Sequence, residues 1–81
     1  MKQIINVFPK DNFRIIATFS DGARKEFDVG LLIKKYKPFE AMLIDKNLFY
    51  SAKIAEGGYA IKWNDELDIS SNSVYYEGKD A

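Results

Sequence analysis

The sequence contains no cysteine and no histidine among its 81 residues. These absences exclude disulfide bonds, thiol catalysis, imidazole base catalysis and zinc sites of the usual kind. Proline occurs twice and glycine five times, which is too few for a flexible linker or a fibrous repeat. Net charge is also absent, because 12 Lys and Arg residues balance 12 Asp and Glu residues. The chain therefore lacks the overall positive field that draws a domain onto nucleic acid.

Long hydrophobic runs are missing as well. Charged residues interrupt the apolar stretches, and none approaches the ~20 apolar residues that are needed to cross a bilayer. The first stretch, Ile4–Phe8, breaks at Asn6 and stops at Pro9, so it is too short for the core of a signal peptide. We therefore expect a cytoplasmic protein without a membrane segment.

Apolar residues are nevertheless plentiful. Hydrophobic residues make up 47% of the chain and aromatic residues 15%, which is typical of a folded domain. The length leaves room for one core, so we predict a single domain over residues 1–81. A domain of this size buries only about 60% of its unfolded surface, so a dimer or a partner protein would stabilise it.

The first half of the chain alternates as strands do. We predict a strand at Ile4–Phe8, closed by a proline-led turn, and a second strand at Phe13–Phe19 with one apolar face. Asp21 and Gly22 mark a hairpin turn, and a third strand follows at Ala23–Asp28. This half is predicted to be an antiparallel three-stranded meander.

The period changes after the third strand. Val29–Tyr36 predicts a short helix with Asp28 as a cap, and a second brief helix begins at Pro38. We predict a turn over residues 45–47 and an extended segment at Leu48–Ala55.

A second hairpin is predicted near the end of the chain. Glu56-Gly57-Gly58 is its turn, and the following strand sends Tyr59, Ile61 and Trp63 to one face. After a polar turn and a brief extended segment, Ser70 or Ser71 caps a short helical turn that carries Val74, Tyr75 and Tyr76, and the tail after Glu77 is expected to fray. The fold class is α+β: a meander, two short helices, a β-hairpin and a C-terminal helical turn, with the helices packed on the sheet.

Short phrases follow one another in a distinctive order along the whole chain. The first half contains Ile4–Pro9, Phe13–Gly22 and Phe27–Val29 followed by Leu31 and Leu32. The second half contains Phe39, Leu43, Phe49, Glu56–Tyr59, Ile61, Trp63–Asn64 and Leu67–Tyr75. In order and spacing these phrases resemble a small bacterial family, the Domain of Unknown Function 2442 family.

This resemblance implies a compact α+β domain that occurs alone or joined to a helix-turn-helix DNA-binding module. It also implies protein pairing, because relatives are often encoded beside small proteins of toxin-antitoxin type. It implies no catalytic residues, since no activity is established for the family.

The turn with Asp65, Glu66 and Asp68 is the most enzyme-like feature, because clustered carboxylates can bind a hard cation or serve as acid and base. Its spacing does not match an EF-hand, since the sixth and twelfth positions from Asn64 lack the required Gly and Glu. We therefore predict a solvated turn, with no metal, no cofactor and no catalytic residue.

A basic cluster of Lys34, Lys35 and Lys37 surrounds Tyr36, a mixture that can bind single-stranded nucleic acid. Acidic residues follow it closely and the whole chain is neutral, so counterion release on binding would be slight. We do not expect this chain alone to bind nucleic acid.

The aromatic group Tyr59, Trp63, Tyr75 and Tyr76 is the strongest candidate for binding, because Trp and Tyr concentrate at interface hot spots. Trp63 fits the core better than a contact surface. Tyr75 and Tyr76 point about 100° apart on a helix, so Tyr76 can contact a partner while Tyr75 faces the core.

The sequence thus favours a non-enzymatic interaction module that binds a protein partner, or a second copy of itself, through its sheet edge and exposed aromatic residues. The candidate binding residues are Trp63, Tyr59, Tyr76, Asp65 and Asp68. One alternative is a small-ligand-binding or metal-binding domain that uses the acidic turn, and another is an accessory to DNA-binding transcriptional regulation.

Overall fold

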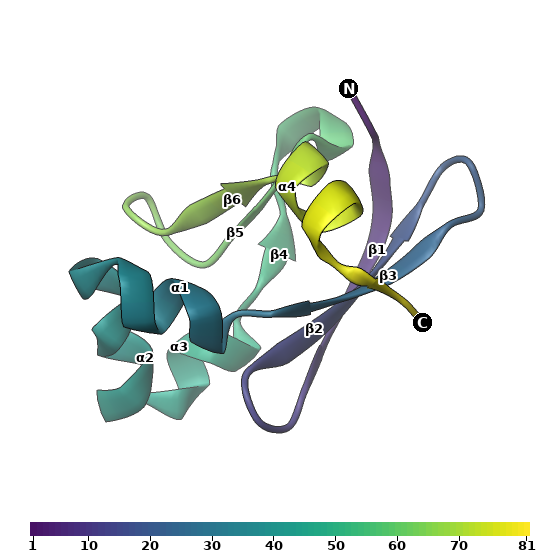
Figure 1. Cartoon of the computed structure of the whole chain (residues 1–81). Helices are drawn as coiled ribbons and strands as arrows, with labels where there is room; N and C mark the ends of the chain where they lie inside the picture. Colours follow the sequence, from purple (N-terminus) through teal and green to yellow (C-terminus); the bar gives the residue numbers. More distant parts are fainter.

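Three antiparallel strands build the first half of the molecule, as predicted. The computed structural model describes all 81 residues. The strands are β1 (Ile4–Lys10), β2 (Arg14–Phe19) and β3 (Arg24–Asp28), and the sheet order is β1-β2-β3-β7 (Figure 1). Ile15, Ala17 and Phe19 alternate along β2 and are all buried. The side-chain period of two therefore gives this sheet one core face, and the alternate residues of β2, Arg14, Ile16 and Thr18, stay exposed or half-buried on the other.

A second, smaller sheet follows later in the chain. It consists of β4 (Lys53–Ile54), β5 (Ala60–Lys62) and β6 (Asp68–Ser70), in the order β4-β5-β6. The predicted hairpin is confirmed, because β4 pairs antiparallel with β5 around the 3-10 turn η2 (Glu56–Gly58). A third strand extends that hairpin.

Helical segments connect the two sheets. These are α1 (Gly30–Lys35), the 3-10 turn η1 (Lys37–Glu40), α2 (Ala41–Ile44), α3 (Lys46–Tyr50) and α4 (Ser71–Glu77). Figure 1 shows α1, α2 and α3 gathered on one side of the molecule, away from α4. The prediction of Asp28 as the cap is wrong, because Val29 is the N-cap of α1 and no side chain caps the helix. Asp28 lies one residue earlier, and its Oδ1 accepts a hydrogen bond from the Gly30 N–H at 2.9 Å.

The predicted turn over residues 45–47 and the first part of the extended segment at Leu48–Ala55 are wrong, while Lys53–Ile54 within that segment is strand β4. Residues 46–50 form helix α3, because Asp45 acts as an N-cap and its side chain accepts a hydrogen bond from the Asn47 N–H at 3.0 Å. Asp is favoured both in turns and at helix N-caps, so the local sequence fits either structure. Burial of Phe49 in the core favours the helix.

The predicted fraying of the tail is also wrong. Residues Lys79–Asp80 form strand β7, which pairs antiparallel with β3. Gly78 allows this pairing, because a Cβ at that position would lie 2.5 Å from the Val74 carbonyl and 3.0 Å from the Glu26 carbonyl. The tail therefore covers the β3 edge of the sheet.

The first hairpin differs from its prediction at both sides of the turn. β1 continues through Pro9 to Lys10, which proline tolerates because β1 is an edge strand. Phe13 belongs to the turn and not to the second strand, with a φ of 58°. Its ring packs edge-on against Phe49 at 5.3 Å, and this contact offsets the backbone strain.

Both sheets and the helices share one hydrophobic core of 15 buried residues. These are Ile4, Ile15, Ala17, Phe19, Phe27, Val29, Ile33, Phe39, Met42, Phe49, Ile61, Trp63, Leu67, Ile69 and Val74. Because every sheet and all the longer helices contribute, the core fixes the position of each surface relative to the others.

Substitution of Gly58 tests the close packing of η2 against β1. Gly58 has a φ of +84°, and a Cβ there would lie 2.7 Å from the Ile4 carbonyl oxygen. Gly22 has a similar φ of +91° but nothing within 4 Å. We expect Gly22→Ala to cost about 1 kcal/mol, the conformational term alone. Gly58→Ala is expected to cost about 3 kcal/mol, because the β1 backbone must also move.

Urea unfolding followed by circular dichroism measures both free energies. Equal losses for the two variants would contradict the close packing of η2 on β1.

Candidate functional site

Trp63, a candidate binding residue, belongs to the core. It is 4% exposed, and its ring packs edge-on against Phe39 at 5.8 Å between centroids. The indole Nε1 donates a hydrogen bond to the Phe49 carbonyl at 3.1 Å. Trp63 therefore connects the β5 side of the molecule with α3 and leaves no surface for a partner.

Tyr59 and Tyr76 are exposed but are not joined by a ring contact. Tyr59 precedes β5, where its carbonyl accepts a hydrogen bond from the Ser71 N–H at 2.9 Å. Tyr76 lies on α4 with 69% of its surface exposed, and its ring packs against Tyr75 at 5.0 Å. As predicted, neighbouring tyrosines on this helix differ in burial, with Tyr75 the one that packs on the core.

The acidic turn does not gather its carboxylates. The side chain of Asp65 is fully exposed, with Lys62 at 3.5 Å, and Asp68 lies opposite Lys62 in β6. The turn is held instead by Asn64, whose Oδ1 accepts hydrogen bonds from the N–H groups of Glu66 and Leu67. The structure contains no group of three or more acidic residues placed to hold a metal ion. The carboxylates of Asp65, Glu66 and Asp68 therefore do not form one group at this turn.

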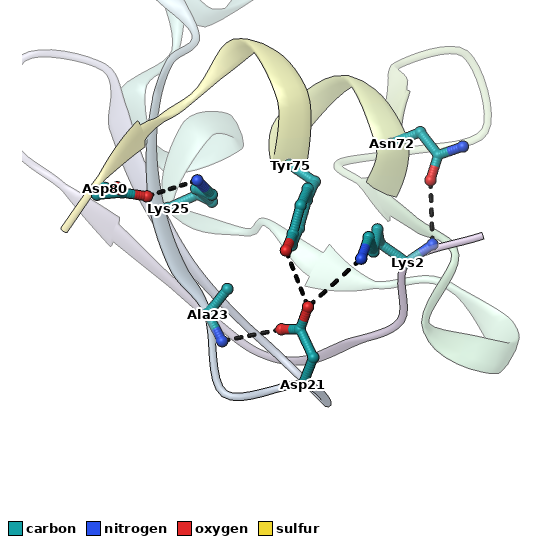
Figure 2. Close-up of polar contacts among 7 residues, drawn as sticks. All are labelled: Lys2, Asp21, Ala23, Lys25, Asn72, Tyr75 and Asp80. Atoms are coloured by element: carbon teal, nitrogen blue, oxygen red, sulfur yellow. Dashed lines mark hydrogen bonds and ion pairs between the residues drawn. The ribbon is translucent and has the colours of Figure 1, made fainter.

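The best-defined polar cluster surrounds Tyr75 (Figure 2). The Tyr75 hydroxyl donates a hydrogen bond to Asp21 Oδ2 at 2.9 Å, and Asp21 Oδ1 accepts one from the Ala23 N–H at 2.9 Å. Lys2 Nζ lies 3.5 Å from the same carboxylate and 4.3 Å from the centroid of the Tyr75 ring. We call Lys2, Asp21 and Tyr75 the Tyr75 cluster.

Further contacts tie both ends of the chain to this cluster. The Lys2 backbone N–H donates to Asn72 Oδ1 at 3.0 Å, which joins the N-terminal segment to α4. Lys25 lies 5.1 Å from the Tyr75 ring and forms an ion pair with Asp80 of β7. The partners are up to 70 residues apart in sequence, so no local pattern could have predicted them. These contacts hold both ends of the chain against the same side of the molecule.

The pKa of Asp21 is lowered from its ordinary value of 3.8. The largest cause is the hydrogen bond from the Ala23 N–H, followed by the Tyr75 hydroxyl, while Lys2 adds a smaller effect. These donors stabilise the ionised carboxylate. The cluster is therefore complete only when Asp21 is charged.

A groove lies between α1 and the end of α4. The sequence did not predict the groove, although it drew attention to Lys34, Lys35 and Tyr36 of its lining as a basic cluster. The groove has a volume of about 370 Å³. We call it the α1 groove; it is lined by Phe27, Leu31, Leu32, Lys34, Lys35, Tyr36 and Glu77. Leu31 and Tyr36 are exposed, and neither Lys34 nor Lys35 takes part in any of the five ion pairs of the structure. The groove thus combines apolar side chains with uncompensated positive charge.

Comparison with known proteins identifies one family. The family model described as "Protein of unknown function (DUF2442)" matches residues 4–80, nearly the whole chain. The chain belongs to the DUF2442 family. No curated protein and no solved structure matches this DUF2442 domain. None of its helices is long and apolar enough to span a membrane.

Substitutions of Trp63 and Tyr76 test which of the two side chains contributes to the core of this DUF2442 domain. Trp63→Ala removes a buried ring and the donor to the Phe49 carbonyl, so we expect a loss of about 3–5 kcal/mol in the free energy of unfolding. Tyr76→Ala is expected to cost less than about 1 kcal/mol, because the side chain is exposed. Urea unfolding followed by circular dichroism measures both. Similar losses for the two variants would contradict the burial of Trp63.

Acid titration tests the Tyr75 cluster. Because the pKa of Asp21 is lower in the folded state, its ionised form stabilises the fold above the ordinary value of 3.8. That contribution disappears as the pH falls through the lowered value. We expect Asp21→Asn to lose less unfolding free energy than the wild type between about pH 5 and pH 2.

Tyr75→Phe keeps the ring but removes one donor to Asp21, so its acid sensitivity is expected to lie between those of Asp21→Asn and the wild type. Urea unfolding followed by Trp63 fluorescence gives the values at each pH. Identical pH profiles for all three proteins would show that Asp21 contributes nothing.

Proposed function

We propose that this DUF2442 domain is a non-enzymatic interaction module that binds a partner protein at the α1 groove. The main support for this proposal is that Leu31 and Tyr36 are exposed beside Lys34 and Lys35, and neither lysine forms an ion pair. Contiguous apolar side chains exposed with a polar rim are typical of protein interaction sites. Tyrosine in particular is enriched at interface hot spots.

The charges of the groove favour an acidic partner segment. Lys34 and Lys35 lie in the last turn of α1, and Glu77 is the single acidic residue of the lining. A segment with apolar residues against Leu31 and carboxylates against the two lysines would match this arrangement. The proposed partner is therefore a protein with an acidic, amphipathic segment, in keeping with the protein pairing that the family resemblance implies.

The distribution of titratable groups supports binding over catalysis. Catalytic groups with shifted pKa values usually lie in clefts that exclude water. Here the resolved shifts belong to Lys2, Asp21, Lys25, Glu26 and Tyr50. Each of these groups is accessible to solvent, and a nearby hydrogen bond or ion pair accounts for the direction of its shift. The one buried polar side-chain atom without a hydrogen bond is Ser71 Oγ, which is not titratable at ordinary pH.

Tyr59 and Tyr76, the aromatic contacts proposed from the sequence, do not line the α1 groove. They belong to the surface around the start of β5 and the outer side of α4. A variant of Tyr76 therefore distinguishes this surface from the groove. We expect the module to act in the cytoplasm, where small domains without disulfides are common.

The experiment compares two leucines of matched exposure. Leu31 is 55% exposed in the groove, and Leu43 is 57% exposed on α2, outside the groove lining. Tagged full-length wild type, Leu31→Asp, Leu43→Asp and Tyr76→Ala are used to capture proteins from a lysate of the source organism, followed by mass spectrometry. The captured protein is then purified, and its affinity for each variant is measured by calorimetry.

We expect one stoichiometric partner that Leu31→Asp weakens by at least about tenfold, because the new carboxylate opposes an acidic segment. Leu43→Asp and Tyr76→Ala are expected to bind as the wild type does. Equal binding by Leu31→Asp and the wild type would overturn the groove as the site. Loss of binding with Tyr76→Ala alone would move the interface to α4.

A further inference from the structure

A hollow separate from the α1 groove lies between helix α3 and the turn that joins β1 to β2 (Figure 1). Its volume is about 390 Å³, within the ~300–1,000 Å³ that is typical of small-molecule sites. We call it the α3 hollow; it is lined by Asp11, Asn12, Phe13, Lys46, Phe49 and Tyr50. None of these residues lines the α1 groove, so the two sites can be tested independently.

Aromatic rings form half of the lining of the α3 hollow. The Phe13 ring meets Phe49 edge-on at 5.3 Å between centroids, and Phe49 meets Tyr50 edge-on at 5.1 Å. Phe49 is 1% exposed and Tyr50 is 46% exposed, so this series of rings leads from the core to the surface. The planar ring of a ligand can extend such a series through the same edge-on or stacked contacts.

The backbone of the turn is strained at the α3 hollow. Asn12 and Phe13 both have left-handed backbone angles, with φ values of 62° and 58°. Asn adopts this conformation readily, whereas a bulky residue such as Phe does so at a cost. Strained residues of this kind are concentrated at ligand sites. Here the strained turn places the Phe13 ring in the lining, against Phe49.

One positive and one negative side chain line the α3 hollow without pairing with each other. Lys46 is the first residue of α3, and Asp11 lies in the turn. Neither residue takes part in any of the five ion pairs of the structure. Each of the two charges can therefore bind a ligand group of the opposite sign.

The hydroxyl of Tyr50 occupies one oxygen of Asp11 and leaves the other for a ligand. It donates a hydrogen bond to Asp11 Oδ1 at 3.1 Å, while Asp11 Oδ2 accepts no hydrogen bond within the protein. This bond is the largest cause that raises the pKa of Tyr50 above its ordinary value of 10.0. The hydroxyl therefore keeps its proton at neutral pH and holds the carboxylate in place.

We propose that the α3 hollow binds a free aromatic amino acid in its zwitterionic form. The ligand ring packs against Phe13 and Tyr50, the ligand carboxylate pairs with Lys46, and the ligand ammonium donates to Asp11 Oδ2. Such a ligand uses both charges of the lining and the aromatic wall together. A ligand with a single charge leaves either Lys46 or Asp11 without a partner, and an aliphatic amino acid forms no aromatic contacts.

Amide NMR of the full chain, titrated with L-phenylalanine, measures this binding. The indole N–H of Trp63 gives a separate signal and donates to the Phe49 carbonyl at 3.1 Å, so it reports on the floor of the hollow. We expect saturating shifts at residues 11–13, at residues 46–50 and at the Trp63 indole, with a dissociation constant below about 10 mM.

Three analogues of L-phenylalanine test which of its groups are recognised. Phenylpropionate lacks the ammonium, phenethylamine lacks the carboxylate, and L-alanine keeps both charges but lacks the ring. We expect each analogue to bind at least about tenfold more weakly than L-phenylalanine, because each loses one charge-assisted bond or the aromatic contacts.

Two variants assign the charges to their partners. Lys46→Met and Asp11→Asn are each expected to weaken L-phenylalanine by at least about tenfold. Lys46→Met is expected to leave phenethylamine unaffected, and Asp11→Asn to leave phenylpropionate unaffected, because those analogues lack the group that the lost charge would bind. Lys53→Met is the matched control, since Lys53 is exposed, forms no ion pair and lies outside the hollow.

The absence of saturating shifts up to about 10 mM L-phenylalanine would overturn the proposal. Equal binding of L-phenylalanine, phenylpropionate and phenethylamine would also overturn it, because the rings alone would then account for binding. Shifts gathered around Leu31 and Tyr36 would place the ligand in the α1 groove instead. Equal affinities of Lys46→Met, Lys53→Met and the wild type would exclude the pairing with Lys46.

Discussion

The hydrogen bond between Tyr75 and Asp21 fixes where the C-terminal helix lies on the rest of the molecule. Its donor is on α4 and its acceptor is in the turn between β2 and β3, and Lys2 completes the cluster from the N-terminal segment. The Tyr75 ring also packs edge-on against Phe19 at 4.9 Å between centroids, so polar and apolar contacts act on the same side chain. With α4 in place, β7 reaches the edge of β3, and Glu77 becomes a wall of the α1 groove.

The same frame also accounts for the character of the α1 groove. The α1 groove is formed by side chains from β3, α1 and the end of α4, so it exists only in the folded molecule. A partner at the groove would therefore recognise side-chain shape and charge.

The sequence was sufficient to predict those strands, turns and helix caps that depend on neighbouring residues. Alternation along β2 and the glycine turns gave the meander and the later hairpin, and Ser70 caps α4 through the Ser73 N–H, as its position suggested. Asp45 led to the wrong prediction of a turn, because Asp is favoured both in turns and at helix caps. The burial of Phe49 in the core favours the helix. Strand β7, the Tyr75 cluster and the α1 groove depend on residues that meet only through tertiary packing. Their local sequence carries no signal of that meeting, which is why Tyr59 and Tyr76 stood out and Leu31 did not.

The contacts between both chain ends and the rest of the molecule affect how the protein folds. The Lys2 backbone N–H bonds to Asn72, and Lys25 pairs with Asp80, so these contacts join segments made early in synthesis to segments made later. Proteins rich in such distant contacts fold more slowly than helical bundles of similar length, because long loops must close before contacts are gained. A chain emerging from the ribosome therefore holds an open meander, with β1 and β3 both unprotected, until α4 and the tail arrive. Vulnerability to aggregation and proteolysis is concentrated in that interval.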